Sequence, residues 1–448
     1  MKRKQRVGMV LLALLLVLPG CGKEEIPIED FVRTNPATVS INNIMKSDTG
    51  YYYGAAYGKE LSLHYFDEES GQNIFLCCKP ECRHDGDVFC TATSSKYEVN
   101  STYFYGGSLY LDVVEIIDNE CMYKLLRVSE DGSELTEIVT YMTVNSTSMI
   151  PVPGQPMMIH RGVAVLPYRL ASMMDAEAGV TGTYFYNLVT GELTGLPELE
   201  YGIKSNGRQR FTGYGDYIYF NTQMDRANTL SRYCLTDGTV EDMELLRTYV
   251  GIYEVMDEDT IYYYYSGDRL FEYKISTKDN IQHDEVFFKK EVRYYDETGA
   301  EIADYDMAKT EGPIYGIETI HRYDCQDMMT DGTYLYVGEE LQFRNVNKED
   351  KGLHADIISI PGAEFKKSYV HVLDRDLNEI AKVHITTEDL LGYCEWFSFK
   401  ILDEVVYLQT FTTVFQCPLE QFLTGEPVFT PIYDHEVEIS PGEYWLDW

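Results

Sequence analysis

A group of sulfur and nitrogen ligands lies within a short stretch near the start of the chain. It consists of Cys77, Cys78, Cys82, His84 and Cys90. Three thiolates and one imidazole can surround a zinc ion tetrahedrally, and a site closed by four protein ligands leaves no open position for catalysis. The spacing is looser than the C-x2-C pairs of zinc fingers. We therefore expect any metal at this group to be structural.

The same cysteines have two other uses that the sequence leaves open. Clustered cysteines outside the cytoplasm commonly form disulfides. The chain has 10 cysteines, and if Cys21 is modified at least one of the others stays unpaired. Disulfides, a structural zinc ion and reduced thiols therefore remain alternatives at this group. The sequence does not require a cofactor, and a structural zinc ion at residues 77–90 is the one candidate.

Motifs of known catalytic sites are missing from the sequence. It contains no G-x-S-x-G, H-E-x-x-H or G-x-x-x-x-G-K-[ST] pattern, so we assign no catalytic residue. Two His-Arg pairs, His160 with Arg161 and His321 with Arg322, lie beside long loops. They are the candidates for contact with an anionic ligand, although such side chains more often pack at a rim or in a core.

A repeat supplies the elements that must position these residues. A turn rich in Gly or Asp leads into an apolar strand that usually ends in Tyr, and a second strand and a second turn follow. The copies span residues 49–53, 106–110, 161–165, 215–219, 258–262, 331–336 and 403–407. Alternating apolar and polar residues between such turns are hairpin signals.

This repeat predicts an all-β protein with a β-propeller fold, because a blade needs about 40–50 residues and four strands. We expect seven blades; six or eight stay open because residues 292–299 form an extra hairpin-like run. Two β-sandwich domains are the alternative, which explains seven copies poorly. The longest irregular segments, 142–158, 167–181, 300–325 and 338–366, are the predicted binding loops.

The N-terminus has the layout of an export signal. Basic residues at the start precede an apolar run over residues 7–18, which is shorter than the roughly 20 residues of a membrane-spanning helix. The run ends in Leu18-Pro19-Gly20-Cys21, which resembles the lipobox of bacterial lipoproteins. The resemblance implies acylation of Cys21 and cleavage before it. We predict a signal peptide at 1–20, lipidated Cys21 with a tether at 21–36, and a propeller at 37–448.

A wider resemblance covers about residues 15–95. The lipobox, the Tyr-rich first repeat and the stretch Leu76-Cys77-Cys78-Lys79-Pro80-Glu81-Cys82-Arg83-His84 resemble a group of surface lipoproteins of Gram-positive anaerobes. Their propellers are similar to the low-density-lipoprotein-receptor and TolB type, although the YWTD tetrapeptide is absent here. The resemblance implies a membrane-anchored propeller without an assigned reaction.

The charge of the chain limits its partners. The net charge is −36, and removal of residues 1–20 deletes four basic residues and no acidic one, which gives −40. Such a surface does not favour nucleic acid. We expect a non-enzymatic propeller at the extracytoplasmic face of the cell membrane, held by lipid on Cys21, that binds an envelope protein, peptide or glycan. A glycan hydrolase with carboxylates in the funnel, and a scaffold for envelope assembly, are the alternatives.

Overall fold

The structure is a computed structural model, and it describes most of the chain between residues 28 and 434. The described ranges are 28–34, 44–47, 49–54, 61–84, 90–151, 156–172, 178–196, 199–202, 210–224, 227–243, 245, 252–265, 269–283, 292–295, 315–320, 328–345, 367–385, 398–402, 404–409 and 413–434.

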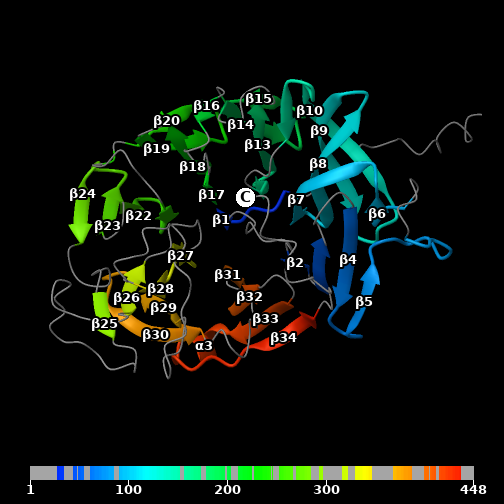
Figure 1. Ribbon diagram of the computed structural model, residues 1–448. Coiled ribbons are helices and arrows are strands. Elements are labelled where there is room, and N and C mark those ends of the chain that lie inside the picture. The colour runs from blue at the N-terminus through cyan, green and yellow to red at the C-terminus, as the bar shows by residue number, and fades with distance from the viewer. Residues whose placement is uncertain are drawn as a thin grey trace, which may run out of the picture.

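The described strands form seven sheets that follow one another along the chain. In Figure 1 the sheets stand around a common centre, with the blue first sheet beside the red last one. Neighbouring strands within each sheet are antiparallel. This arrangement is a seven-bladed β-propeller, so the predicted fold class is confirmed.

The first three blades come from the first half of the chain. Blade 1 contains β2 (Ile44–Lys46), β3 (Gly50–Gly54), β4 (Leu61–Asp67), β5 (Gln72–Phe75) and β6 (Thr93–Ser94). Blade 2 contains β7 (Tyr97–Tyr105), β8 (Ser108–Ile117), β9 (Glu120–Ser129) and β10 (Leu135–Asn145). Blade 3 contains β11 (Met149–Pro151), β12 (Met158–His160), β13 (Val163–Ser172), β14 (Ala178–Asn187), β15 (Leu193–Gly195) and β16 (Leu199–Gly202).

Blade 4 includes one strand from outside its own repeat. It contains β1 (Arg33–Thr34), β17 (Phe211–Tyr214), β18 (Tyr217–Met224), β19 (Ala227–Cys234) and β20 (Val240–Asp242). β1 pairs with β17, with Arg33 opposite Tyr214 and Thr34 opposite Gly213. Part of the segment that we predicted to be a tether is therefore a strand of the propeller.

The last three blades complete the ring. Blade 5 contains β21 (Ile252–Val255), β22 (Thr260–Tyr265), β23 (Arg269–Lys274) and β24 (Asn280–His283). Blade 6 contains β25 (Val292–Tyr295), β26 (Tyr315–Ile320), β27 (Met328–Thr330), β28 (Leu335–Asn345), β29 (Lys367–Leu373) and β30 (Glu379–Ile385). Blade 7 contains β31 (Ser398–Leu402), β32 (Val405–Gln409), β33 (Thr413–Pro418) and β34 (Thr430–Asp434), and the short helix α3 (Leu419–Phe422) follows β33.

The two faces of the ring carry different connections. Because successive strands are antiparallel, the first-to-second turn and the third-to-fourth turn of each blade open on the same face. Gly106–Gly107 is a turn of the first kind and residues 130–132 form one of the second kind. This face is named the turn face. The hairpins between second and third strands, such as the one at Asp118–Asn119, lie on the opposite face, named the hairpin face.

The structure resolves the questions that the repeat left open. The extra run at 292–295 is β25, which pairs with β26 and belongs to blade 6, so it makes no eighth blade. The predicted loops are partly strand: residues 167–172 and 178–181 extend the β13–β14 ladder, with Pro167 opposite Thr183. The loop prediction was wrong there, because a ladder continues through proline where its missing N–H is not needed.

Tyrosine dominates the interior of the ring. The largest fully buried side chains are Tyr51, Tyr52, Tyr105, Tyr110, Tyr123, Tyr219, Tyr253, Tyr263, Tyr273, Tyr336 and Phe185. A Tyr ring fills apolar space while its hydroxyl reaches a polar partner. The Tyr253 hydroxyl in blade 5 donates to the Tyr219 carbonyl in blade 4 at 2.8 Å, and the Tyr52 hydroxyl in blade 1 donates to the Glu130 backbone carbonyl in blade 2 at 3.1 Å.

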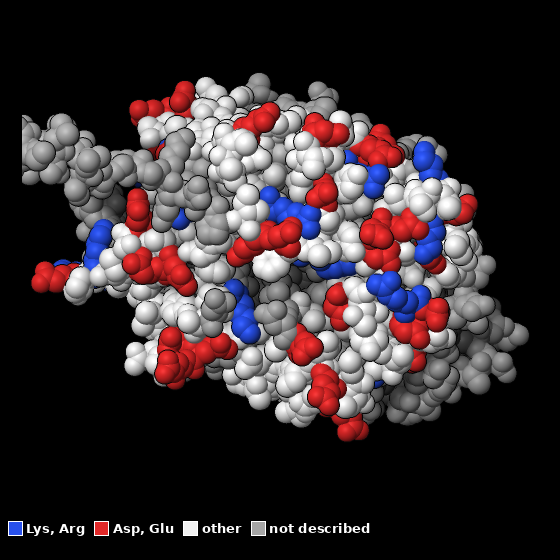
Figure 2. Space-filling view, turned by 180° about the vertical axis from the view of Figure 1, so that it is seen from behind, with Lys and Arg blue, Asp and Glu red and all other residues white. Residues whose placement is uncertain are grey.

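Among the described residues, side chains of blades 1 and 7 meet and close the ring. Tyr51 of blade 1 and Tyr407 of blade 7 pack edge to face, with ring centroids 6.0 Å apart and hydroxyls 3.3 Å apart. No described helix is long and apolar enough to cross a membrane. Asp and Glu side chains are spread over the face seen in Figure 2, with Lys and Arg between them.

Candidate functional site

The loop between β5 and β6 brings the cysteine cluster together at the interface of blades 1 and 2. After β5 the Leu76 amide donates to the Leu63 carbonyl at 3.0 Å, which keeps the chain beside β4. The chain then returns to β4, where β6 pairs Ser94 with Leu61. Leu76 and Cys90 both belong to the hydrophobic core that blades 1 and 2 share. The loop is therefore built into the ring.

A contact with blade 2 holds both ends of this loop. The Thr91 hydroxyl donates to the Leu76 carbonyl at 3.1 Å and the Gly132 carbonyl at 2.7 Å. Gly132 has a φ of +67°, and a β-carbon there would lie 2.5 Å from the Leu76 oxygen. Only glycine permits both the backbone conformation and this close approach. The turn of blade 2 therefore buttresses the loop that carries the cysteines.

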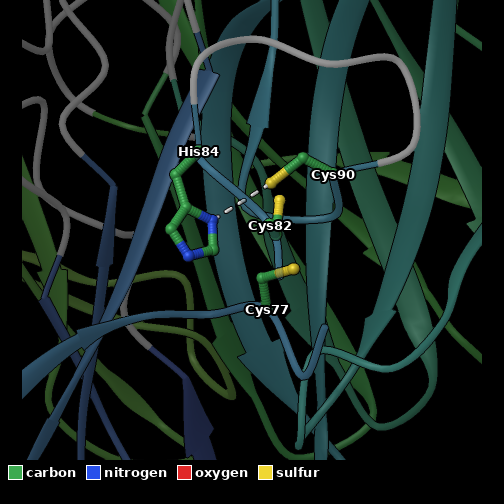
Figure 3. Close-up of side chains that lie close together, drawn as sticks. All are labelled: Cys77, Cys82, His84 and Cys90. Atoms are coloured by element: carbon green, nitrogen blue, oxygen red, sulfur yellow. Dashed lines mark hydrogen bonds between the residues drawn. The ribbon is translucent and has the colours of Figure 1, made fainter. Parts of the chain in front are cut away.

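Four of the five predicted residues converge in one group. The ligand atoms of Cys77, Cys82, His84 and Cys90 all lie within 4.8 Å of one another. Figure 3 shows the three sulfur atoms turned toward one another, with the His84 ring beside them. The His84 Nδ1 atom lies 3.5 Å from the Cys90 sulfur. These residues form a group that could hold a metal ion.

The histidine of the cluster is held by its backbone and by an aromatic neighbour. His84 has a φ of 54°, in the left-handed region that a non-glycine residue adopts only at a cost. Its ring stacks on Phe75, with centroids 4.5 Å apart, and Phe75 in turn packs against His64. Cys90 is buried and accepts a hydrogen bond from the Thr93 amide at 3.3 Å. The ligand atoms are thus positioned by packing on both sides.

The environment of Cys77 favours the form that binds metal. Burial opposes its ionisation, but hydrogen bonds from the Lys79 amide and from Thr91 outweigh this and lower the pKa of Cys77 to about 7. For Cys82, a hydrogen bond from the His84 amide favours the thiolate, but burial and the nearby thiols raise its pKa. Several thiolates at close range repel one another, and a divalent cation would remove that repulsion.

The donor set fits zinc in kind and in number. In a tetrahedral site with Zn–S of about 2.3 Å, neighbouring ligand atoms lie roughly 3.7 Å apart. A group within 4.8 Å needs only a small contraction to reach that geometry. A disulfide could use only two of the three thiols and would leave the imidazole without a role, whereas one metal ion uses all four groups.

The remaining described cysteines lie apart from this group. Cys78 is exposed and is not a member, although we included it among the candidates. Cys121 and Cys417 are buried, and Cys234 is half-buried at the end of β19. All described cysteines are free thiols in the structure.

His160 contacts the N-terminal segment through a buried ring. It is fully buried, its Nε2 atom lies 2.8 Å from the Gly215 carbonyl, and its Nδ1 atom lies 2.8 Å from the Thr34 hydroxyl. A carbonyl only accepts, so Nε2 carries the proton and Nδ1 accepts from Thr34. Burial lowers the pKa of His160 to about 4. The neutral imidazole therefore ties β1 to blades 3 and 4.

Arg161 also contacts the N-terminal segment. Its guanidinium bonds to Asp30 at 2.9 Å, to the Phe31 carbonyl at 3.1 Å and to Asp216 at 2.7 Å. The structure thus brings His160 and Arg161 together around residues 28–34 of the same chain. His321, Arg322 and Cys21 lie outside the described residues, so their predicted roles remain predictions.

The structure contains a buried ionic group inside the ring that the sequence analysis did not predict. Arg210 donates to the Glu254 carboxylate and, at 3.1 Å, to the Met328 carbonyl, while Arg33 donates to the Met256 carbonyl at 2.7 Å. Burial raises the pKa of Glu254 although both guanidinium groups oppose it. These residues come from distant parts of the chain, so no local motif marks them. They join β1 to the inner strands of blades 4, 5 and 6.

Comparisons with known proteins add structural similarities of low score. No protein-family model matches the chain, and no curated protein matches it in sequence. A prolyl endopeptidase structure matches with a TM-score of 0.46 and 12% identity over 91% of this chain and 51% of its own, so this chain spans about half its length. BamB from Moraxella catarrhalis matches with a TM-score of 0.35 and 10% identity, over 86% of this chain and 95% of BamB. TolB from Acinetobacter baumannii matches with a TM-score of 0.31 and 12% identity, over 85% of this chain and 76% of TolB.

Proposed function

We propose that the chain is an extracytoplasmic binding propeller, anchored to the cell membrane by lipid on Cys21, whose ligand is a protein, peptide or glycan of the cell envelope. The leader that ends in Leu18-Pro19-Gly20-Cys21 supports the anchor. The strongly negative charge argues against a nucleic acid as the ligand. A rigid ring that displays hairpins from several blades is suited to recognition, because loops on a rigid scaffold carry binding residues.

The observation that carries this proposal is the tip of the β8–β9 hairpin on the hairpin face. Asp118 and Asn119 have φ values of 49° and 69°, which suit a tight two-residue hairpin turn. Beside this turn Ile116 and Ile117 are 50% and 47% exposed. The Ser146 amide donates to the Asn119 carbonyl at 2.8 Å and supports the tip from the side. Two exposed isoleucines on a fixed tip make an apolar contact point for a ligand.

The experiment is a cross-linked pull-down with residues 22–448 as bait and envelope extract as prey. The test variant is Ile116→Ser/Ile117→Ser, and the control is Ile281→Ser/Ile380→Ser on the outer strands β24 and β30, where exposure is 43% and 45%. We expect wild type and control to capture the same protein or glycan and the test variant to lose it. Equal capture by all three would remove the tip from the binding site. Capture of nothing by any of them would refute the envelope ligand.

We further propose that Cys77, Cys82, His84 and Cys90 bind one zinc ion and that this ion is structural. The four ligand atoms lie within 4.8 Å of one another, and four protein ligands on one zinc ion would leave no position for a substrate. The loop that carries them packs against the core shared by blades 1 and 2. The ion would therefore fix the loop between β5 and β6 of blade 1 where it packs against blade 2. Removal of the ion should therefore change the free energy of unfolding of the protein and not a catalytic rate.

A further inference from the structure

The N-terminal segment crosses the turn face of the propeller. The Glu29 amide donates to the Tyr105 hydroxyl at 2.8 Å, and the Gly106 amide of blade 2 donates to the Glu29 carboxylate at 3.0 Å. The Gly215 amide of blade 4 donates to the Val32 carbonyl at 2.8 Å. Each of these partners lies at a first-to-second turn. Residues 28–34 are therefore fixed across the turns that surround one mouth of the ring.

Apolar side chains of this segment point to solvent. Ile28, Phe31 and Val32 are 56%, 55% and 57% exposed, and Val189 in the third-to-fourth turn of blade 3 is 59% exposed. Ile28 and Val189 flank Gly162, where a β-carbon would lie 3.7 Å from Ile28 and 3.9 Å from Val189. The backbone polar groups bind the turns, so these apolar side chains stay outside. The four residues, Ile28, Phe31, Val32 and Val189, are named the apolar patch.

The charged groups beside the apolar patch are paired. Arg161 bridges Asp30 and Asp216, and the Glu29 carboxylate accepts from a backbone amide, so one guanidinium lies among three carboxylates and the local charge is negative. Among the described residues, no cluster of basic side chains that would favour anionic lipids lies beside the patch. A surface of this kind suits the interface of a bilayer with zwitterionic headgroups, where apolar side chains enter while paired charges stay hydrated.

The distance to the anchor limits what can cover the patch. Cys21 lies seven residues before Ile28, and a fully extended chain of that length spans at most about 25 Å. Lipid on Cys21 would thus keep the apolar patch close to the membrane surface. We propose that the turn face lies against the membrane, with Ile28, Phe31, Val32 and Val189 in the headgroup region. The hairpin face then points away from the membrane. This inference rests on the lipid anchor of the proposed function.

The test places a fluorescent reporter on each face of the acylated, full mature protein. Phe31→Trp puts a tryptophan in the apolar patch, and Ile116→Trp puts one on the hairpin tip, at positions that are 55% and 50% exposed. Each variant is reconstituted in phosphatidylcholine vesicles with or without brominated acyl chains. Wild type is reconstituted in the same way, and the fluorescence of its 3 native tryptophans is subtracted from that of each variant. We expect bromine to quench the added fluorescence of Phe31→Trp at least twofold and to leave that of Ile116→Trp unchanged.

Two outcomes separate this inference from the anchor on which it rests. An intact mass that shows no acyl group on Cys21 would refute the anchor, and the orientation would fall with it. Acylated protein in which the Phe31→Trp signal is not quenched, or in which Ile116→Trp is quenched equally, would refute the orientation alone. Both substitutions lie at exposed positions, so far-UV circular dichroism should match wild type.

Discussion

Blades 1 and 4 each contain a piece beyond four consecutive strands, and the two pieces are held by different chemistry. In blade 1 the added piece is the loop that returns from β5 to β6, and its ligands are three thiols and an imidazole. In blade 4 it is β1, which pairs with β17 and bonds to His160, while Asp30 and Phe31 before it bond to Arg161. With the proposed zinc ion bound, the first piece would depend on the metal and on reduced thiols, whereas the second depends on hydrogen bonds and on protonation state. Each can therefore be disrupted without disturbing the other.

The largest expected effect comes from removing one ligand in blade 1. Cys82→Ser should abolish metal binding and lower the free energy of unfolding by part of the roughly 10–16 kcal/mol with which structural zinc binds, because that binding free energy is also folding free energy. Cys78→Ser is the matched control, since Cys78 is exposed and outside the group. Urea unfolding of the mature domain measures both. Equal stability of the two variants would show that blade 1 does not depend on the cluster.

A pH titration should act on blade 4 through His160. Its pKa lies at about 4 in the folded protein against 6.5 for the free side chain, because burial disfavours the charged ring. The stability that the neutral ring contributes is thus complete above pH 6.5 and is lost as the pH falls toward 4, by about 3 kcal/mol. The stability difference between wild type and His160→Gln should shrink over that range. A difference that stays constant from pH 7 to 4 would contradict this assignment.

A smaller effect should follow from filling the space beside His160. A β-carbon on Gly213 would lie 2.3 Å from the His160 ring, so Gly213→Ala must displace the imidazole and weaken its bond to Thr34. We expect a loss of about 2 kcal/mol. Gly195→Ala is the milder control, because its closest neighbour is Tyr184 Cε1 at 3.0 Å. Zinc content should be unchanged in both; its loss in Gly213→Ala would mean that the two blades are coupled.

The sequence predicted the ring better than it predicted these two added pieces. Each of the seven copies falls on one strand of a different blade: β3, β8, the degenerate copy in β13, β18, β22, β28 and β32. Alternation and turn residues are local properties, so they can be read along the chain. The pairing of Arg33 with Tyr214 is a contact across 181 positions, and no local pattern signals it.

The cluster shows the same limit. Its residue types indicated metal or disulfide chemistry, but which cysteines converge depends on the path of the loop. Cys77 and Cys78 are neighbours in sequence, yet only Cys77 faces the group. Ile28, Phe31 and Val32 were the signal for the patch within the predicted tether, but no local pattern indicated on which face of the propeller they lie.

The most direct test of the account is the metal content and thiol state of the purified, acylated protein. Inductively coupled plasma mass spectrometry gives the zinc per chain, and alkylation under native and denaturing conditions followed by intact mass gives the free thiols. We predict about one zinc ion per chain, with Cys77, Cys82 and Cys90 protected from alkylation until a chelator is added. A protein without metal in which two of these cysteines are joined by a disulfide would contradict the metal centre and leave blade 1 held by an oxidised loop.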